Sequence, residues 1–350
     1  MIAATATDLV VVTLLIEGGV LVLALAAILV HIGWRAFDDP RRQDRVEAAR
    51  RALAQVLAGE TPPTTDALRA LRSLRRGERL RLLAGYAAVA GGAGPHALAS
   101  LAEQSGMTHQ ALAQAHSRRW SARLVGARAL TAAGAGADVM PALLDDPHPA
   151  VRAQAAEWAA THGDDAVIAR LVTHLSDRSP AARFSIQDAV IRLGARATPA
   201  VARQLDLADE GPLAISLLEV AEAVGDPVAC RAAGRFLHAS DPRARELACL
   251  AAARLGDSDT MDDLQDALAD PDEGVRAAAA RSLGAAGHWA AAGKLRRALG
   301  DPGWEVRRAS GLALHALGAP GAVLLRQALR DEDRFARDMA RLVLELEDQD

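Results

Sequence analysis

The sequence predicts an all-α protein: an α-solenoid of helical hairpins preceded by one transmembrane helix. Glycine recurs at a fixed step through the C-terminal two thirds, arginine recurs eleven residues before it, and one long apolar run lies near the N-terminus. Repeats of about 20–50 residues are typical of stacked supersecondary units. We therefore expect a transmembrane anchor over 1–34, a juxtamembrane helical adaptor over 35–115 and a repeat solenoid over 116–350.

The predicted anchor rests on residues 9–30, which are apolar except for Thr13, Glu17 and the glycines. A helix of this length can cross the hydrocarbon core of a bilayer. No Lys or Arg precedes the run, which disfavours a cleaved signal peptide. Six arginines follow between Arg35 and Arg51. Because positive charge stays in the cytoplasm, we expect a single-pass protein of the inner membrane, with its N-terminus outside and the solenoid cytoplasmic.

Glu17 lies near the centre of this predicted span and is followed by Gly18 and Gly19. An ionisable group within the hydrocarbon core costs about 2.5–3.5 kcal/mol, which a simple anchor has no need to carry. Small residues let a second helix approach closely. The three residues therefore predict contact with a partner transmembrane helix, from an integral membrane protein or a second copy of the chain. The alternative is that Glu17 is protonated and tolerated.

The adaptor carries helical patterns that lack the repeat register. Asp39 and Pro40 are expected to begin a helix that ends at Gly59, and further short amphipathic stretches follow. Because a solenoid needs capping at its ends, we expect these helices to form an N-terminal cap.

Positive charge concentrates between Arg35 and Arg81, a stretch with twelve arginines and seven acids. Basic residues near a membrane surface attract anionic lipid. This collar is expected either to bind anionic lipid or to serve only as a topology determinant with solvated helix faces. Residues 82–350 are acidic, with 28 basic and 35 acidic residues, which argues against nucleic acid as a partner.

Each repeat is expected to form a helical hairpin. In most repeats a leucine lies eight residues before the recurring arginine, and an aspartate, often followed by proline, lies six before it. Aspartate and proline favour a helix start, and glycine favours the left-handed conformation that ends a helix. An alanine-rich second helix should therefore end at each recurring glycine: Gly134, Gly163, Gly194, Gly225, Gly256, Gly287 and Gly318.

The frame L-x-D-P-x-x-x-V-R-x-x-A, closed by glycine, resembles HEAT repeats of the short bacterial type, which also occur in phycobilisome lyase subunits. The resemblance covers about residues 116–350. It implies an α-solenoid that binds proteins, and it implies no reaction. The arrangement is similar to that of membrane-anchored HEAT proteins that accompany polysaccharide-making glycosyltransferases. The function implied is a membrane-anchored scaffold or accessory subunit that binds a partner protein, with a membrane glycosyltransferase as one candidate.

In this family, aspartate–arginine ladders between adjacent repeats are structural. The resemblance implies that role for Arg152, Arg183, Arg245, Arg276, Arg307, Arg337, Asp146, Asp177, Asp270 and Asp301. The pattern fails over 205–214, where Ala214 replaces the arginine, and the following Asp-Pro is displaced to Asp241 and Pro242. The middle of the array is therefore expected to be its least regular part, either as a bend or through drift.

We find no catalytic constellation and expect no cofactor and no metal. The sequence lacks a P-loop and an HExxH motif, its ten histidines share no ligand spacing, and Cys230 and Cys249 form no CxxC. Trp304 and Phe335 come just ahead of the second helix in successive repeats, where they line a binding rim or belong to the core. The alternatives to a scaffold are a bilin lyase-like or DNA glycosylase-like enzyme or enzyme subunit, and a self-associating membrane-organising protein.

Overall fold

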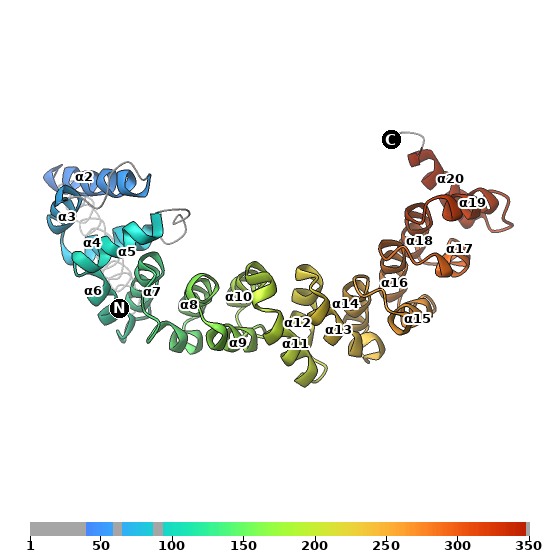
Figure 1. Cartoon of the computed structure of the whole chain (residues 1–350), viewed down its shortest axis with the longest axis horizontal. Helices are drawn as coiled ribbons and strands as arrows, with labels where there is room; N and C mark the ends of the chain where they lie inside the picture. The colour runs from blue at the N-terminus through green and yellow to red at the C-terminus, as the bar shows by residue number, and fades with distance from the viewer. Residues whose placement is uncertain (1–39, 59–64, 87–93, 348–350) are drawn as a thin grey trace, which may run out of the picture.

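The computed structural model describes residues 40–58, 65–86 and 94–347. Helices stack side by side in a curved row, with the two ends of the described chain at opposite ends of the arc (Figure 1). No strand occurs in these ranges. The prediction of an all-α solenoid is confirmed.

In the part of the chain that the structure describes, five helices precede the repeat register. They are α2 (Pro40–Leu57), α3 (Thr65–Arg72), α4 (Arg76–Gly85), α5 (Gly94–Gln104) and α6 (Met107–Ala115). Helices α4, α5 and α6 pack on α7 (Trp120–Ala133), the first helix in register. Leu53, Leu71 and Leu83 are fully buried and join the same continuous core as the repeats.

Each repeat contributes one helix to the concave side of the arc. These inner helices follow α7 in the order α8 (Pro149–His162), α10 (Pro180–Leu193), α12 (Pro212–Val224), α14 (Pro242–Ala252), α16 (Glu273–Ala285), α18 (Trp304–Ala316) and α20 (Arg334–Glu347). Their N-terminal ends share one edge of the solenoid, because every repeat has the same hand.

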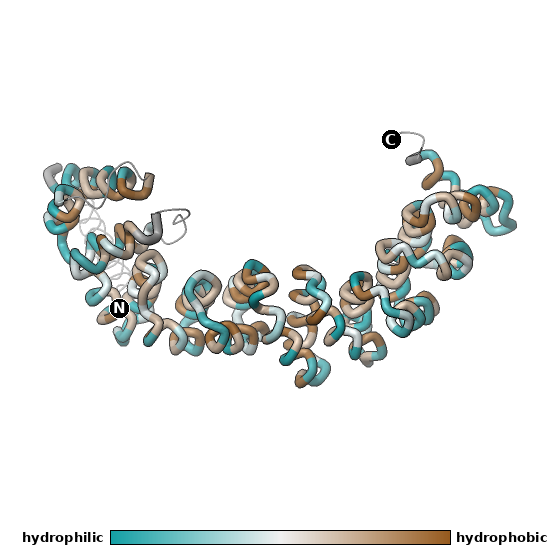
Figure 2. Tube along the Cα trace, viewed as in Figure 1, coloured by the Kyte–Doolittle hydropathy of each residue, from teal (hydrophilic) through white to brown (hydrophobic). Residues whose placement is uncertain are grey.

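The convex side is formed by shorter outer helices. They are η1 (Met140–Asp145), α9 (Asp165–Thr173), α11 (Thr198–Leu207), α13 (Pro227–Ala233), α15 (Ser258–Ala267), α17 (Ala292–Ala298) and α19 (Ala319–Ala328). Short 3₁₀ turns adjoin three of them: η2 (Gly194–Arg196), η3 (Gly234–His238) and η4 (Trp289–Ala291). Hydrophobic and hydrophilic stretches alternate along these helices, as one-sided burial requires (Figure 2).

The small residues of the repeat allow close stacking of the inner helices. Ala155, Ala248 and Ala279, at one register position, are fully buried. Among the inner helices, the closest approach at a glycine lies between α16 and α18, where a Cβ placed on Gly284 would lie 2.7 Å from Ala313. Packing between α10 and α12 is the sparsest of all neighbouring inner pairs.

The turn before each inner helix differs in detail from the expected cap. Asp146 lies two residues ahead of the N-cap, His148, and accepts a hydrogen bond from the His148 N–H at 2.8 Å. The proline at the first turn of α8 is Pro149 rather than the proline of the Asp-Pro pair. The recurring aspartate therefore shapes the turn instead of capping the helix directly. Gly134 ends α7 in the left-handed conformation (φ 61°), whereas Gly163 follows α8 with φ −68°.

The predicted membrane location is corrected here. Within the described ranges, no helix combines the length and apolar character needed to cross a bilayer. The expected span over 9–30, with Glu17, Gly18 and Gly19, lies outside the described residues. The inner-membrane localisation that the arginine asymmetry suggested is therefore contradicted, because none of the described helices could span a membrane.

Candidate protein-binding surface

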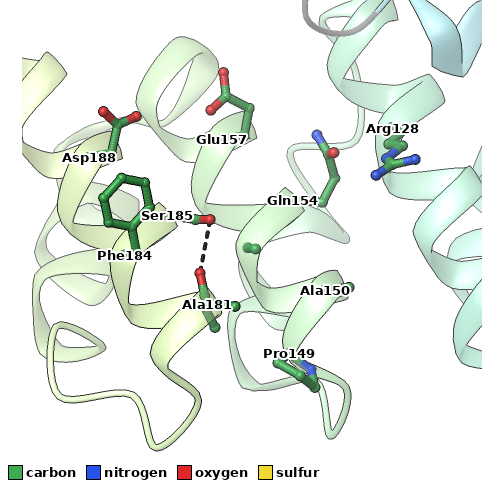
Figure 3. A pocket seen from close by; sticks show the side chains of 11 residues that line it. Arg128, Pro149, Ala150, Gln154, Glu157, Ala181, Phe184, Ser185 and Asp188 are labelled. Atoms are coloured by element: carbon green, nitrogen blue, oxygen red, sulfur yellow. Dashed lines mark hydrogen bonds between the residues drawn. The ribbon is translucent and has the colours of Figure 1, made fainter.

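A hollow of about 480 Å³ opens on the concave side, where α7, α8 and α10 adjoin. Its floor is made of small residues of α8 and α10, among them Ala150, Ala153 and Ala181. Phe184 of α10 stands at one side and Arg128 of α7 at the other (Figure 3). Alanines at these positions leave room that larger side chains would fill, so the hollow follows directly from the composition of the repeat.

Phe184 is the most distinctive residue of this hollow. Its side chain is 73% exposed, although phenylalanine is normally buried. It lies one residue after the ladder arginine of its repeat, a position held by Ala153 in the preceding repeat and by Ile215 in the following one. Sequence reasoning missed Phe184, although a single aromatic at an outward position of an alanine-rich helix is a signal that could have found it.

Some of the polar groups around the hollow form ion pairs and hydrogen bonds with each other. Arg192 of α10 pairs with Glu157 of α8 across the repeat boundary and with Asp188 on its own helix at 2.9 Å. The Ser185 hydroxyl donates to the Ala181 carbonyl at 3.1 Å. Arg128 is exposed, and in the described structure it forms no ion pair. The hollow thus offers an apolar centre with a free cation on one side and neutralised carboxylates on the other.

A chain of polar contacts continues along the inner helices. The Gln187 side chain donates to Glu219 at 3.0 Å, and Arg243 contacts both Glu219 and Glu246. These groups are half-exposed and bridge α10, α12 and α14. Ion pairs at such exposure contribute little to stability, so these contacts belong to the surface of the solenoid and not to its core.

The recurring arginines and aspartates meet at the edge of the solenoid where the inner helices begin. In four places an arginine bonds a carboxylate of the next repeat through both Nε and Nη2, at 2.6–2.9 Å. Its Nη1 donates to two carbonyls of its own turn. These rungs are Arg123–Asp146, Arg152–Asp177, Arg245–Asp270 and Arg276–Asp301.

The rungs are largely buried, and this burial affects the pKa of their carboxylates. Burial raises the pKa of Asp177, but hydrogen bonds from Arg152 and from the Ser179 N–H outweigh it, so this pKa lies below the ordinary value of 3.8. Asp146 and Asp270 behave in the same way. The side chains are 3–15% exposed in all four rungs. Each rung is therefore a charged pair well shielded from water.

Within the described residues, three of the predicted ladder arginines have no aspartate partner. Arg183 keeps only a bond from Nη1 to the Asp177 carbonyl, at 3.1 Å. Arg307 places its guanidinium 4.6 Å from the ring centre of Phe335. Arg337, in the last helix, donates only to the carbonyls of Asp331 and Glu332.

Other residues join the repeats where the pattern fails. Glu210 accepts from the backbone N–H groups of Ser240 and Asp241, which lie in the turn before α14. Arg235 donates to the carbonyls of Leu205 and Asp206 at the end of α11. These contacts bridge repeats at the failure, but they leave Arg183 without a carboxylate.

Trp304 and Phe335 lie near the same edge, at the starts of α18 and α20. They are 50% and 43% exposed, so they are not core residues. Arg308 lies 5.5 Å from the Trp304 ring centre, and Arg334 lies near Phe335. Their apolar faces are thus partly covered by arginines of the chain itself, unlike Phe184.

The two cysteines are buried free thiols. Burial raises the pKa of Cys249 to about 12, and burial also raises the pKa of Cys230. Both are therefore protonated at neutral pH and poorly nucleophilic. Among the described residues, no group of three or more His, Cys, Asp or Glu side chains is arranged to hold a metal ion.

The comparisons with known proteins give one family match and several similar solved structures. The family model for HEAT repeats matches residues 261–345. Kap121p bound to RanGTP is similar over 90% of this chain and 42% of its own, with 13% identity and a TM-score of 0.52. The complex of CpcE and CpcF of phycocyanin lyase from Nostoc sp. PCC7120 is similar over 69% of this chain and 94% of its own, with 22% identity and a TM-score of 0.30. No curated protein sequence matches.

Human deoxyhypusine hydroxylase is a further solved structure with similarity to this chain. It shares 20% identity over 79% of this chain and 97% of its own, with a TM-score of 0.30. The likeness to Kap121p extends to the fold. The chain thus folds as an α-solenoid, of which residues 261–345 match the model for HEAT repeats.

Proposed function

We propose that the protein is a non-enzymatic scaffold that binds a partner protein along the concave face of the solenoid, with the hollow beside Phe184 as the anchoring point. The observation that carries this proposal is the exposed phenylalanine above a floor of alanines, flanked by Arg128 and by paired carboxylates. Large aromatic side chains in small pockets contribute most of the free energy of many protein interfaces.

The partner that suits this surface presents an apolar side chain on a helix or an extended segment. The alanine floor admits that side chain, and Gln154 and Ser185 supply polar contacts beside it. A DNA glycosylase-like role would require a basic concave face, whereas the polar residues here carry both signs. A membrane glycosyltransferase as partner stays a hypothesis of the sequence alone, and the localisation correction removes its main support.

The proposal is tested by site-specific photocrosslinking in the native host. A photoreactive amino acid replaces Phe184 on the inner face, and in a matched control it replaces Val228 on outer helix α13, which is 58% exposed. We expect a defined adduct from position 184 that is missing from position 228. Phe184→Ala should weaken partner binding about tenfold or more without lowering the melting temperature, because the ring is exposed. Equal adducts from both positions would contradict a binding role for the concave face.

A further inference from the structure

The intact rungs define a receptor geometry for a carboxylate. In each, the Nε and Nη2 of a ladder arginine form two parallel bonds to one aspartate, while Nη1 is fixed by carbonyls of its own turn. A guanidinium held in this way is preorganised for bidentate carboxylate binding. The four rungs share this arrangement, so the position where a carboxylate binds is known for every ladder arginine.

We call the Nε and Nη2 donors of a ladder arginine its fork. At Arg183 the fork is open, because no carboxylate of the described chain binds it. The register position that supplies the carboxylate is Ala208, and its backbone (φ −72°, ψ 135°) closely matches that of Asp146 in an intact rung (φ −58°, ψ 139°). The turn is therefore in place and only the carboxylate is missing. The side chain of Arg183 is half-buried, and its Nη1 still bonds the Asp177 carbonyl, as in the other rungs.

No other group of the described chain takes the place of the missing aspartate. The comparable fork of Arg307 is covered by the ring of Phe335, but Arg183 has no ring contact. Asp209 is exposed and forms no ion pair with Arg183, and Glu210 is bound to Ser240 of the next repeat. An unpaired guanidinium that is partly withdrawn from water favours an external anion.

The open fork adjoins the surface already described. Arg183 directly precedes Phe184 on α10, and the packing of α10 on α12 is the sparsest along the inner face. Because Arg183 and Phe184 are consecutive residues of α10, one short segment could reach both the guanidinium and the hollow. Such a segment would carry a carboxylate and an apolar side chain a few residues apart.

We propose that Arg183 is a receptor for an aspartate or glutamate side chain of the partner protein, which completes the open rung while an apolar residue of the same segment enters the hollow beside Phe184. This inference rests on the proposed function and specifies the chemistry of the partner. The partner thereby supplies in trans the acid that the next repeat supplies in cis elsewhere in the array.

The test uses the full chain and a random heptapeptide display library, followed by affinity measurements on the enriched peptides. We expect enrichment of peptides with an acidic residue near an apolar one. Arg183→Gln should weaken their binding about tenfold, as expected for loss of a charged hydrogen-bonded pair. Enrichment of peptides without acids, or no enrichment, would overturn the inference.

Ala208→Asp is the most discriminating variant, because its carboxylate should bind Arg183 within the chain and so complete the open rung. It is expected to raise the melting temperature and to weaken acidic-peptide binding by about tenfold or more. Ala239→Asp is the matched control: it adds the same charge at the same register position one repeat later, where Ala214 replaces the arginine. Equal effects of the two aspartates on peptide binding would indicate long-range repulsion and would overturn the inference.

Two further arms separate the remaining explanations. Succinate is titrated alone, and tight succinate binding without preference for acidic peptides would indicate a free carboxylate ligand and contradict a partner side chain. Phe184→Ala is measured with the same peptides. Binding that depends on Phe184 but not on Arg183 would leave the proposed function standing and reject this inference, whereas independence from both would reject both.

Discussion

One residue type at one register position has three different environments in this molecule. Arg276 bonds the carboxylate of Asp301, Arg307 covers the ring of Phe335, and Arg183 faces no side-chain partner in the described chain. The helix around each arginine is similar, so the difference comes from the next repeat. The contribution of a ladder arginine to stability should follow its partner and not its position in the repeat.

This rule predicts unequal effects of the same substitution. Arg276→Ala should lower the free energy of unfolding by roughly 2–3 kcal/mol, because it leaves Asp301 shielded from water without its charged donor. Arg183→Ala should cost less than about 1 kcal/mol, since it removes a single neutral acceptor bond. Urea unfolding followed by circular dichroism measures both. Similar losses in the two variants would show that the bond to the aspartate adds no stability beyond the carbonyl bond.

At the scale of helices, the array depends on close approach between inner neighbours. Gly284 of α16 lies against Ala313 of α18, and there is no room for a methyl group. Gly293 of α17 is also helical but exposed, with no atom near its absent Cβ. The two glycines therefore have different physical roles although both lie inside helices.

We expect alanine substitution at these two glycines to have opposite signs. Gly284→Ala should destabilise the fold by about 1–3 kcal/mol through overpacking. Gly293→Ala should stabilise it by roughly 0.5–1 kcal/mol, because alanine is the better helix former. Thermal unfolding of the two single variants provides the comparison. A stabilised Gly284→Ala protein would mean that α16 and α18 can separate without cost.

At the scale of the whole molecule, the solenoid has one weak junction. The sparsest inner packing and the open rung coincide between α10 and α12, with the two halves of the arc on either side. In a solenoid each repeat contacts only its neighbours, so a weak interface is not reinforced from elsewhere. Bending of the arc should therefore concentrate at this junction.

Distance measurements between spin labels test this expectation. Labels at Glu103 on α5 and Gln327 on α19 are exposed and span the junction, and the native cysteines are buried. Ala208→Asp should narrow the distance distribution, since it adds an ion pair between α10 and the turn before α12. Ala239→Asp serves as the control and should leave the width unchanged. Distributions of equal width in wild type and Ala208→Asp would place the flexibility elsewhere.

The periodic features of the sequence are sufficient to determine the fold class. Apolar spacing, turn residues and the glycine step are local signals, and a repeat multiplies each of them, so the hairpins followed directly. The irregular middle was also visible as the loss of an arginine and a displaced Asp-Pro. The expected membrane location did not survive, because a single apolar run carries none of the redundancy that made the repeats reliable.

Only the tertiary structure decided what the surface offers. Which way the repeats curve, and therefore which exposed residue faces the concavity, depends on small rotations summed over many helices. Phe184 became notable once its exposure was known, and Arg183 once its fork was seen to lack an acceptor. The sequence specifies which residues recur, whereas the contacts between repeats decide which of them remain without a partner, because those contacts join residues about 25 positions apart.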